Sequence, residues 1–150
     1  MRMLIVALFA LFSTGAMADG HLVTLESAHD VKTTADRLEA AINANAASGA
    51  RVFARIDHAE AAKSVGKELP PTTVVIFGNP NGGTPMMAAQ RTIAVDLPLR
   101  VLISEIDGKV VVAYHDPAKV AEFHGLPTDH PAVVGAGKAL KGLTGKAASQ

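Results

Sequence analysis

Residues 100–114 read RVLISEIDGKVVVAY, and they predict the central feature of the fold. Two apolar runs, Arg100–Ile106 and Lys109–Tyr114, flank the dipeptide Asp107-Gly108. Asp-Gly between apolar runs is typical of a two-residue β-hairpin loop, because both positions of that turn require a positive φ. The stretch therefore predicts two antiparallel strands joined by a tight turn.

Strand and helix patterns alternate on both sides of this hairpin. Residues 21–27 and 51–57 alternate between apolar and polar side chains, and residues 72–77 are β-branched and apolar on both faces, so three further strands are expected. Between these strands lie segments whose apolar residues recur at helical spacing, and two further helical segments follow the hairpin. The order predicts one α+β domain with a mixed sheet of about five strands and helices packed on it. The last residues, 146–150, are expected to fray.

The first eighteen residues have the features of a secretory leader. Arg2 precedes the apolar run Leu4–Phe12, and Ala16-Met17-Ala18 forms an A-x-A cleavage signature. The apolar run is shorter than the roughly 20 residues that cross a bilayer. We therefore expect residues 1–18 to be removed, residues 19–150 to form the mature domain in the periplasm or outside the cell, and no membrane span to remain. An uncleaved N-terminal anchor is the alternative.

Composition excludes several classes of function. The chain carries 14 basic and 14 acidic residues, and removal of Arg2 with the leader leaves 13 and 14. Neither sign is concentrated, so no nucleic-acid partner is expected. The chain has no cysteine, which excludes disulfides, thiolate nucleophiles and cysteine-held metal or cluster sites.

Several short sequence motifs together resemble those of a known family. They are Ile56-Asp57-His58-Ala59, Leu69-Pro70-Pro71-Thr72, Phe77-Gly78-Asn79-Pro80, Asp96-Leu97-Pro98-Leu99, Asp107-Gly108-Lys109-Val110, Asp116-Pro117 and His124. In this order they resemble the domain of unknown function 302 (DUF302) family. The resemblance implies a mixed sheet with helices on one side, similar to the TATA-binding-protein-like arrangement, and a homodimer. The family has no established reaction, so it supplies no catalytic residue.

The segment Ile76–Met87, IFGNPNGGTPMM, is the first candidate site. A strand, a glycine-rich turn and a helix N-terminus can bring free backbone N–H groups together on an anion. Asn79, Gly82, Gly83 and Thr84 would line such a site for a small or anionic ligand. The alternative is a plain turn, with Thr84 as helix N-cap and Pro85 in the first helical position. Both interpretations remain open from the sequence.

His58 is the second candidate because it directly follows the strand predicted at 51–57. If that strand and the one at 72–77 are parallel neighbours, their carboxyl ends meet and His58 faces Asn79. Tyr114 is a candidate wall of the same crevice, although packing at the base of the hairpin explains it equally well. The favoured hypothesis is a secreted, non-catalytic binding domain with its site in this crevice.

Two other functions compete with binding. His58, His124 and Met87 supply imidazole and thioether ligands suited to copper or haem, although a methionine at helical spacing is more often part of a core. An enzyme with His58 as base is the third hypothesis. No G-x-S-x-G motif is present, and no two carboxylates have a spacing in the sequence that suits acid–base catalysis. An enzyme is therefore the less favoured hypothesis.

Overall fold

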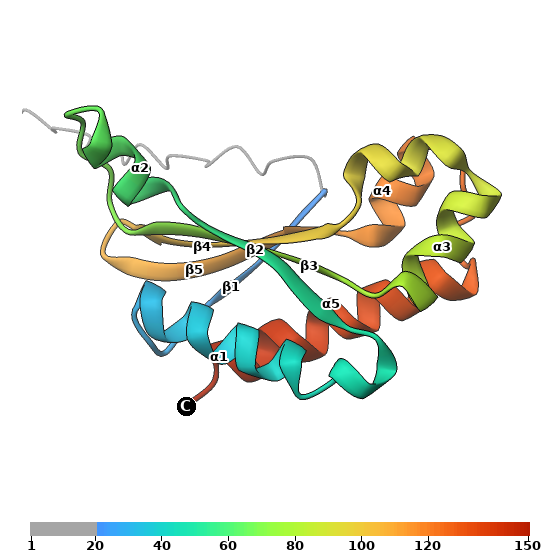
Figure 1. Cartoon of the computed structure of the whole chain (residues 1–150), viewed down its shortest axis with the longest axis horizontal. Helices are drawn as coiled ribbons and strands as arrows, with labels where there is room; N and C mark the ends of the chain where they lie inside the picture. The colour runs from blue at the N-terminus through green and yellow to red at the C-terminus, as the bar shows by residue number, and fades with distance from the viewer. Residues whose placement is uncertain (1–20) are drawn as a thin grey trace, which may run out of the picture.

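The computed structural model describes residues 21–150, and within them five strands form one sheet (Figure 1). The strands are β1 (Leu22–Glu26), β2 (Arg51–Asp57), β3 (Thr72–Gly78), β4 (Leu99–Ile106) and β5 (Lys109–His115). They lie in the order β1-β5-β4-β3-β2. The leader predicted at 1–18 lies outside the described residues. In residues 21–150, no helix has the length and apolar character that crossing a membrane requires.

The hairpin that the sequence predicts is confirmed. Ile106 pairs with Lys109 at the end of an antiparallel ladder between β4 and β5. The two residues between them have positive φ, 51° at Asp107 and 75° at Gly108. Asp and Gly are the residues that tolerate this conformation best, so the local sequence determines the turn.

The expectation of a mixed sheet is wrong in one respect, because all four strand pairings are antiparallel. β2 and β3 run in opposite directions, with Arg51 opposite Gly78 and Asp57 opposite Thr73. The helix between them, α2 (His58–Ser64), has seven residues and is therefore only about 10 Å long. A parallel neighbour would require the chain to cross back along a seven-residue strand, about 23 Å, whereas here β3 starts beside the end of β2 and runs antiparallel to it.

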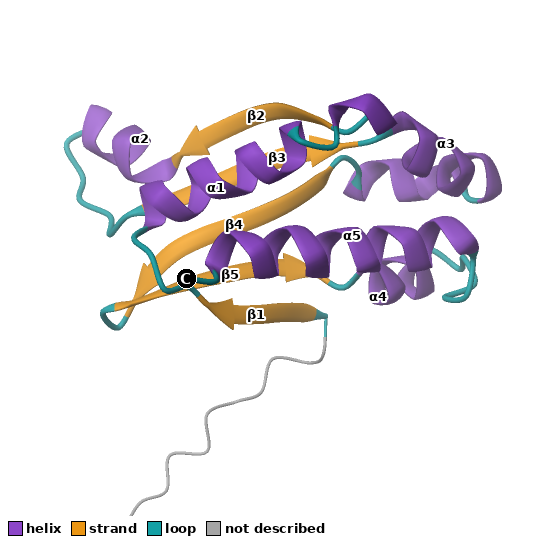
Figure 2. Cartoon of the chain, turned by 90° about the horizontal axis from the view of Figure 1, so that it is seen from below, coloured by secondary structure: helices purple, strands orange, loops and turns teal. Residues whose placement is uncertain are grey.

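Two long helices cover one face of the sheet (Figures 1 and 2). They are α1 (Val31–Asn43) and α5 (Pro131–Ala148). Asp30 caps α1 by accepting a hydrogen bond from the Thr33 N–H at 2.6 Å. The core between the layers includes Leu38 and Ile42 of α1, Leu140 of α5, and every second residue of the central strands, such as Val75 and Phe77. Alternation in the strands and three- and four-residue spacing in the helices therefore produce one common core.

The helix α5 extends into the segment 146–150, which the sequence predicts to fray. The helix continues through Ala148, and Ala147 and Ala148 are buried. Arg37 of α1 donates hydrogen bonds to the carbonyl oxygens of Lys146, Ala147 and Ser149 at 2.8–3.1 Å. Packing and these side-chain bonds outweigh the weak helix propensity of the glycines in α5.

A second apolar cluster lies beyond one end of the sheet. It joins the first half of α5 to α3 (Pro80–Ala89), the 3₁₀-helix η2 (Arg91–Asp96) and α4 (Pro117–Phe123). Met86, Ile93, Ala121, Leu126 and Val133 are its buried members. α2 lies at the opposite end of the sheet (Figure 1), so the two ends differ in what covers them.

Candidate functional site

A groove of about 1270 Å³ lies between α3 and α5. One wall is the face of α5 that runs from His130 to Lys146, and the other includes residues 79–87 of α3 and its N-cap. Ala41 and Asn45 extend that second wall toward α1, and Phe77 and Leu99 at the ends of two central strands form part of the floor. The groove exists because α3 projects past the sheet while α5 spans both the sheet and the second cluster.

The groove lining is apolar with a small number of polar side chains. Alanine, glycine, proline, leucine, phenylalanine and methionine account for most of it. Lys138 and Lys146 are its two lysines, and both are exposed. None of the described residues that line the groove is acidic.

Asn79, Gly82, Gly83 and Thr84, the candidates from the glycine-rich segment, all line this groove. The predicted cap is wrong, however, because α3 starts at Pro80 and not after Thr84. Asn79 is the N-cap, since its Oδ1 accepts a hydrogen bond from the Asn81 N–H at 2.9 Å. The asparagine competes successfully with Thr84 because Pro80 supplies the fixed φ of the first helical position.

The start of α3 does not present the free N–H groups that an anion cradle requires. Pro80 has none, and the Asn81 N–H bonds to the Asn79 side chain. The N–H groups of Gly82 and Gly83 donate to the Asn79 carbonyl oxygen at 3.0 and 2.9 Å. This turn therefore satisfies its own donors, as the plain-turn interpretation expects.

The Asn79 side chain also ties α3 to the segment before β2. Its Nδ2 donates to the Ser48 carbonyl oxygen at 3.0 Å, and Nδ2 of Asn81 donates to the same oxygen at 3.0 Å. Ser48 ends the 3₁₀-helix η1 (Ala46–Ser48), and Gly49 follows with a φ of 96°. A Cβ at Gly49 would lie 2.9 Å from Asn79 Oδ1, so this close approach requires glycine.

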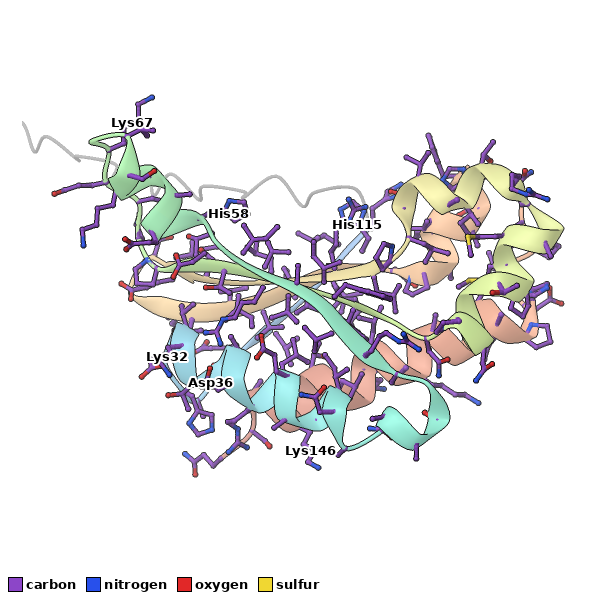
Figure 3. The ribbon with its side chains drawn as sticks, in the orientation of Figure 1. Lys32, Asp36, His58, Lys67, His115 and Lys146 are labelled. Atoms are coloured by element: carbon purple, nitrogen blue, oxygen red, sulfur yellow. The ribbon has the colours of Figure 1, made fainter. Side chains whose placement is uncertain are left out.

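His58 does not face Asn79. It is the first residue of α2 and lies at the end of β2, whereas Asn79 follows the far end of the antiparallel β3. Figure 3 shows His58 on the sheet face opposite α1 and α5, the same side as His115. The expected crevice between the two strand ends is absent from the described residues because the strands are antiparallel.

Tyr114 is a core residue and not a wall of the groove. It belongs to β5, is 6% exposed and packs in the cluster between the sheet and the two long helices. Burial raises the pKa of its hydroxyl, and a hydrogen bond with Thr144 of α5 opposes that rise. The packing interpretation of Tyr114 is therefore correct.

A polar trio at the end of α4 was not foreseen as a unit. His124 Nε2 lies 2.7 Å from Asp96 Oδ2, and His124 Nδ1 lies 3.0 Å from Thr92 Oγ1. The order carboxylate, imidazole, hydroxyl is the one that hydrolases use to activate a nucleophile. Neither Thr92 nor His124 lines the groove, and Asp96 also accepts a hydrogen bond from Arg100 at 3.2 Å. The trio of Asp96, His124 and Thr92 therefore joins η2 to α4.

The three candidate metal ligands lie on separate elements. His58 starts α2, Met87 lies in α3 and packs against the second cluster, and His124 ends α4. Both ring nitrogens of His124 already contact protein oxygen atoms. Within residues 21–150, no three side chains of the His, Cys, Asp or Glu type gather as a metal site.

With this geometry established, comparison with known proteins identifies the family. The model of the "Domain of unknown function DUF302" matches residues 23–144. The chain belongs to this family. The match includes β2 to β5, all of β1 except Leu22, and most of α5, and it confirms the resemblance that the short sequence motifs indicate.

Two curated relatives of this DUF302 chain are named as channels. They are "Fluoride-specific ion channel FluC 1" of Brucella suis biovar 1 (strain 1330) and the protein of the same name of Brucella abortus biovar 1 (strain 9-941). Each is 45% identical over 112 residues, which are 74% of this chain. The chain spans only 43% and 40% of their lengths, respectively.

A solved structure has the same fold. The uncharacterized conserved protein DUF302 from Bacillus stearothermophilus superposes with a TM-score of 0.75 at 15% identity. The match covers 85% of this chain and 98% of that one. At this identity the likeness establishes the shared α+β architecture.

Proposed function

We propose that this chain is a non-catalytic binding domain whose site is the groove between α3 and α5. The observation that carries the proposal is the size of the groove together with its apolar lining. Small-molecule sites are typically apolar clefts of roughly 300–1,000 Å³ with few polar groups, and a groove of about 1270 Å³ is larger than that range, so it has room for a ligand of this class. The ligand is therefore a small, predominantly apolar molecule.

The walls of the groove support an apolar ligand. Leu97, Leu99 and Leu143 offer aliphatic surface, and Phe53 offers aromatic surface. Phe53 is 53% exposed, which leaves a large apolar side chain in water when the groove is empty. Covering this surface with a ligand would release water from it, and that release is the main source of affinity in apolar sites.

Two glycines of α5 provide a matched pair of variants for the test. Gly142 lines the groove and Gly137 does not, and a Cβ at either position would meet nothing within 4 Å. We expect Gly142→Leu to fill part of the groove and to weaken binding of a neutral apolar dye, N-phenyl-1-naphthylamine, by about tenfold or more. Gly137→Leu should bind the dye as the unchanged chain does. Equal dye binding by both folded variants would refute the proposal.

The proposal places the domain in the periplasm or outside the cell, after removal of residues 1–18. The leader features of the sequence support this location. Mass spectrometry of the exported chain should find Asp19 as the first residue. A full-length chain retained in the membrane fraction would favour the N-terminal anchor. The homodimer stays a prediction, to be measured by sedimentation equilibrium.

The channel-named relatives favour a second candidate function, that of an accessory domain in fluoride handling. The support is 45% identity over 112 residues to proteins of which this chain spans about two fifths. The pore itself is not proposed for this chain. If the accessory role is correct, deletion of the gene should lower the fluoride concentration that stops growth. Unchanged fluoride tolerance, with the chain restored as control, would remove this candidate.

A further inference from the structure

We propose that the ligand of the groove is a single-chain amphiphile with an anionic end group, such as a long-chain fatty acid. This inference rests on the proposed function and specifies its ligand class. Three features carry it: the length of the α5 segment that lines the groove, the sign of its charged side chains, and the absence of donors arranged for a compact anion among the described lining residues.

The shape of the groove fits a chain-like molecule. The lining along α5 extends from His130 to Lys146, which at 1.5 Å per residue is about 24 Å. Small residues occupy that helix face at three- and four-residue spacing, namely Ala132, Gly135, Ala136, Ala139 and Gly142. These five residues form a trough of small side chains, since none of them carries more than a methyl group. An extended alkyl chain fits along such a trough better than a compact ring system does.

The two lysines of the groove favour a ligand with an anionic end group. Lys138 and Lys146 are exposed, and neither forms an ion pair with a carboxylate within residues 21–150. Figure 3 shows the Lys146 side chain pointing away from the sheet, at the outer rim of the helix layer. The methylene stems of these lysines can cover an alkyl chain while their ammonium groups stay in water. An anionic end group at the rim therefore gains a favourable contact without being buried.

A compact anion such as phosphate fits the groove poorly. The N–H groups at the start of α3 are bonded to Asn79, and no described lining residue is an arginine. Fork-like donors and free helix amides are the groups that hold phosphate or sulfate tightly. Two separated lysines provide attraction but no such geometry, so affinity must come chiefly from the alkyl chain.

The decisive experiment is calorimetric titration of the purified mature chain with decanoate, dodecanoate and tetradecanoate, each below its micelle concentration. Each added methylene should raise the affinity about fourfold until the trough is full. The alcohols of the same lengths should follow the same trend but bind more weakly, by about three- to tenfold. Added salt should weaken only the carboxylates. An affinity that does not depend on chain length would overturn the inference.

Lysine variants test the end-group contact. Lys138→Gln combined with Lys146→Gln should weaken carboxylate binding about three- to tenfold and leave alcohol binding unchanged. Lys141→Gln is the matched control, because Lys141 is an exposed lysine of α5 that does not line the groove. If the double variant and the control bind carboxylates equally, the end-group assignment is wrong.

The remaining outcomes separate this inference from the proposed function. Dye binding that Gly142→Leu blocks, with no binding of any alkyl compound, overturns the ligand class and leaves the groove as the site. Loss of both dye and alkyl binding in the unchanged chain refutes the proposed function itself. Co-sedimentation with vesicles of phosphatidylglycerol, without binding of monomeric carboxylates, would show that the lysines meet a lipid surface and would overturn the inference.

Discussion

His124 Nε2 lies 2.7 Å from Asp96 Oδ2, and this contact joins the end of α4 to the 3₁₀-helix that follows α3. The His124 side chain is only 8% exposed, so water reaches its imidazole ring poorly. The same 3₁₀-helix contributes Ile93 to the second apolar cluster. The contact therefore stabilises the region that supports α3, one wall of the groove, although neither ring nitrogen reaches the groove.

Replacing His124 with alanine should destabilise the chain by about 1–3 kcal/mol, since two hydrogen bonds are lost and a largely buried ring leaves a void. Urea unfolding followed by circular dichroism measures the change. His58→Ala is the matched control, because His58 is exposed, and its effect should stay within about 0.5 kcal/mol. Loss of stability or of dye binding in His58→Ala would indicate that His58 takes part in the binding site, contrary to what the antiparallel strands indicate.

Asn79→Ala should cost about 1 kcal/mol, because the N-cap of α3 and the bond to the Ser48 carbonyl oxygen are both removed. Asn79→Asp should cost less, since the carboxylate still caps the helix and only the bond to Ser48 is lost. The measurement is the urea midpoint of the two variants. The interpretation of Asn79 as a cap fails if Asp is as damaging as Ala.

Gly137→Ala should stabilise the chain by up to about 1 kcal/mol, because alanine favours a helix interior and the new methyl group meets nothing within 4 Å. Gly49→Ala should do the opposite, by at least about 1 kcal/mol, since Gly49 has a φ of 96° and its Cβ would crowd Asn79. Thermal unfolding of both variants gives opposite shifts of the midpoint. Shifts of the same sign would contradict the backbone assignment at one of these two glycines.

Stability should fall in acid because of Asp30 and Asp36. The hydrogen bond from the Thr33 backbone N–H holds the pKa of the Asp30 carboxyl below its ordinary value of 3.8, and hydrogen bonds from Lys32 and Arg55 lower the pKa of Asp36. A lowered folded-state pKa gives stability that is present above the unfolded value and lost as the pH falls through the folded value. Thermal midpoints measured below pH 3.8 should therefore decline.

The variant Asp30→Asn isolates one of these two carboxyls. Asparagine caps a helix as well as aspartate does, but it does not titrate. The acid-induced decline of the midpoint should therefore become smaller in Asp30→Asn, while the midpoint near neutral pH changes little. An unchanged decline would assign the acid sensitivity to other groups, with Asp36 the first to examine.

The features that the sequence predicted correctly are those set by neighbouring residues. Asp107-Gly108 specifies its hairpin because the turn needs only those two residues. The direction of β2 relative to β3 depends on the packing of the whole sheet, which the periodicity of a single segment does not report. His58 was expected to face Asn79 only because β2 and β3 were expected to be parallel.

Other features depend on partners that are distant in sequence. Asp96 and His124 are separated by 28 residues, and no local motif joins them. The helical conformation of residues 146–148 depends on Arg37 and on burial against α1. The glycines of α5 considered alone indicate a weak helix. Part of the groove was predicted, at residues 79–84, because glycines and a proline mark a turn. Its other wall on α5 was missed because small residues carry no signal of binding.

The pairing of β1 with β5 has a consequence for how the chain reaches its final state. Leu22 lies opposite His115, so the first strand finds its only described sheet partner after a long stretch of chain. Contacts between such distant segments form slowly, because the intervening loop must first be closed. If the polypeptide is exported as we propose, β1 has no partner strand beyond the membrane until β5 has crossed as well.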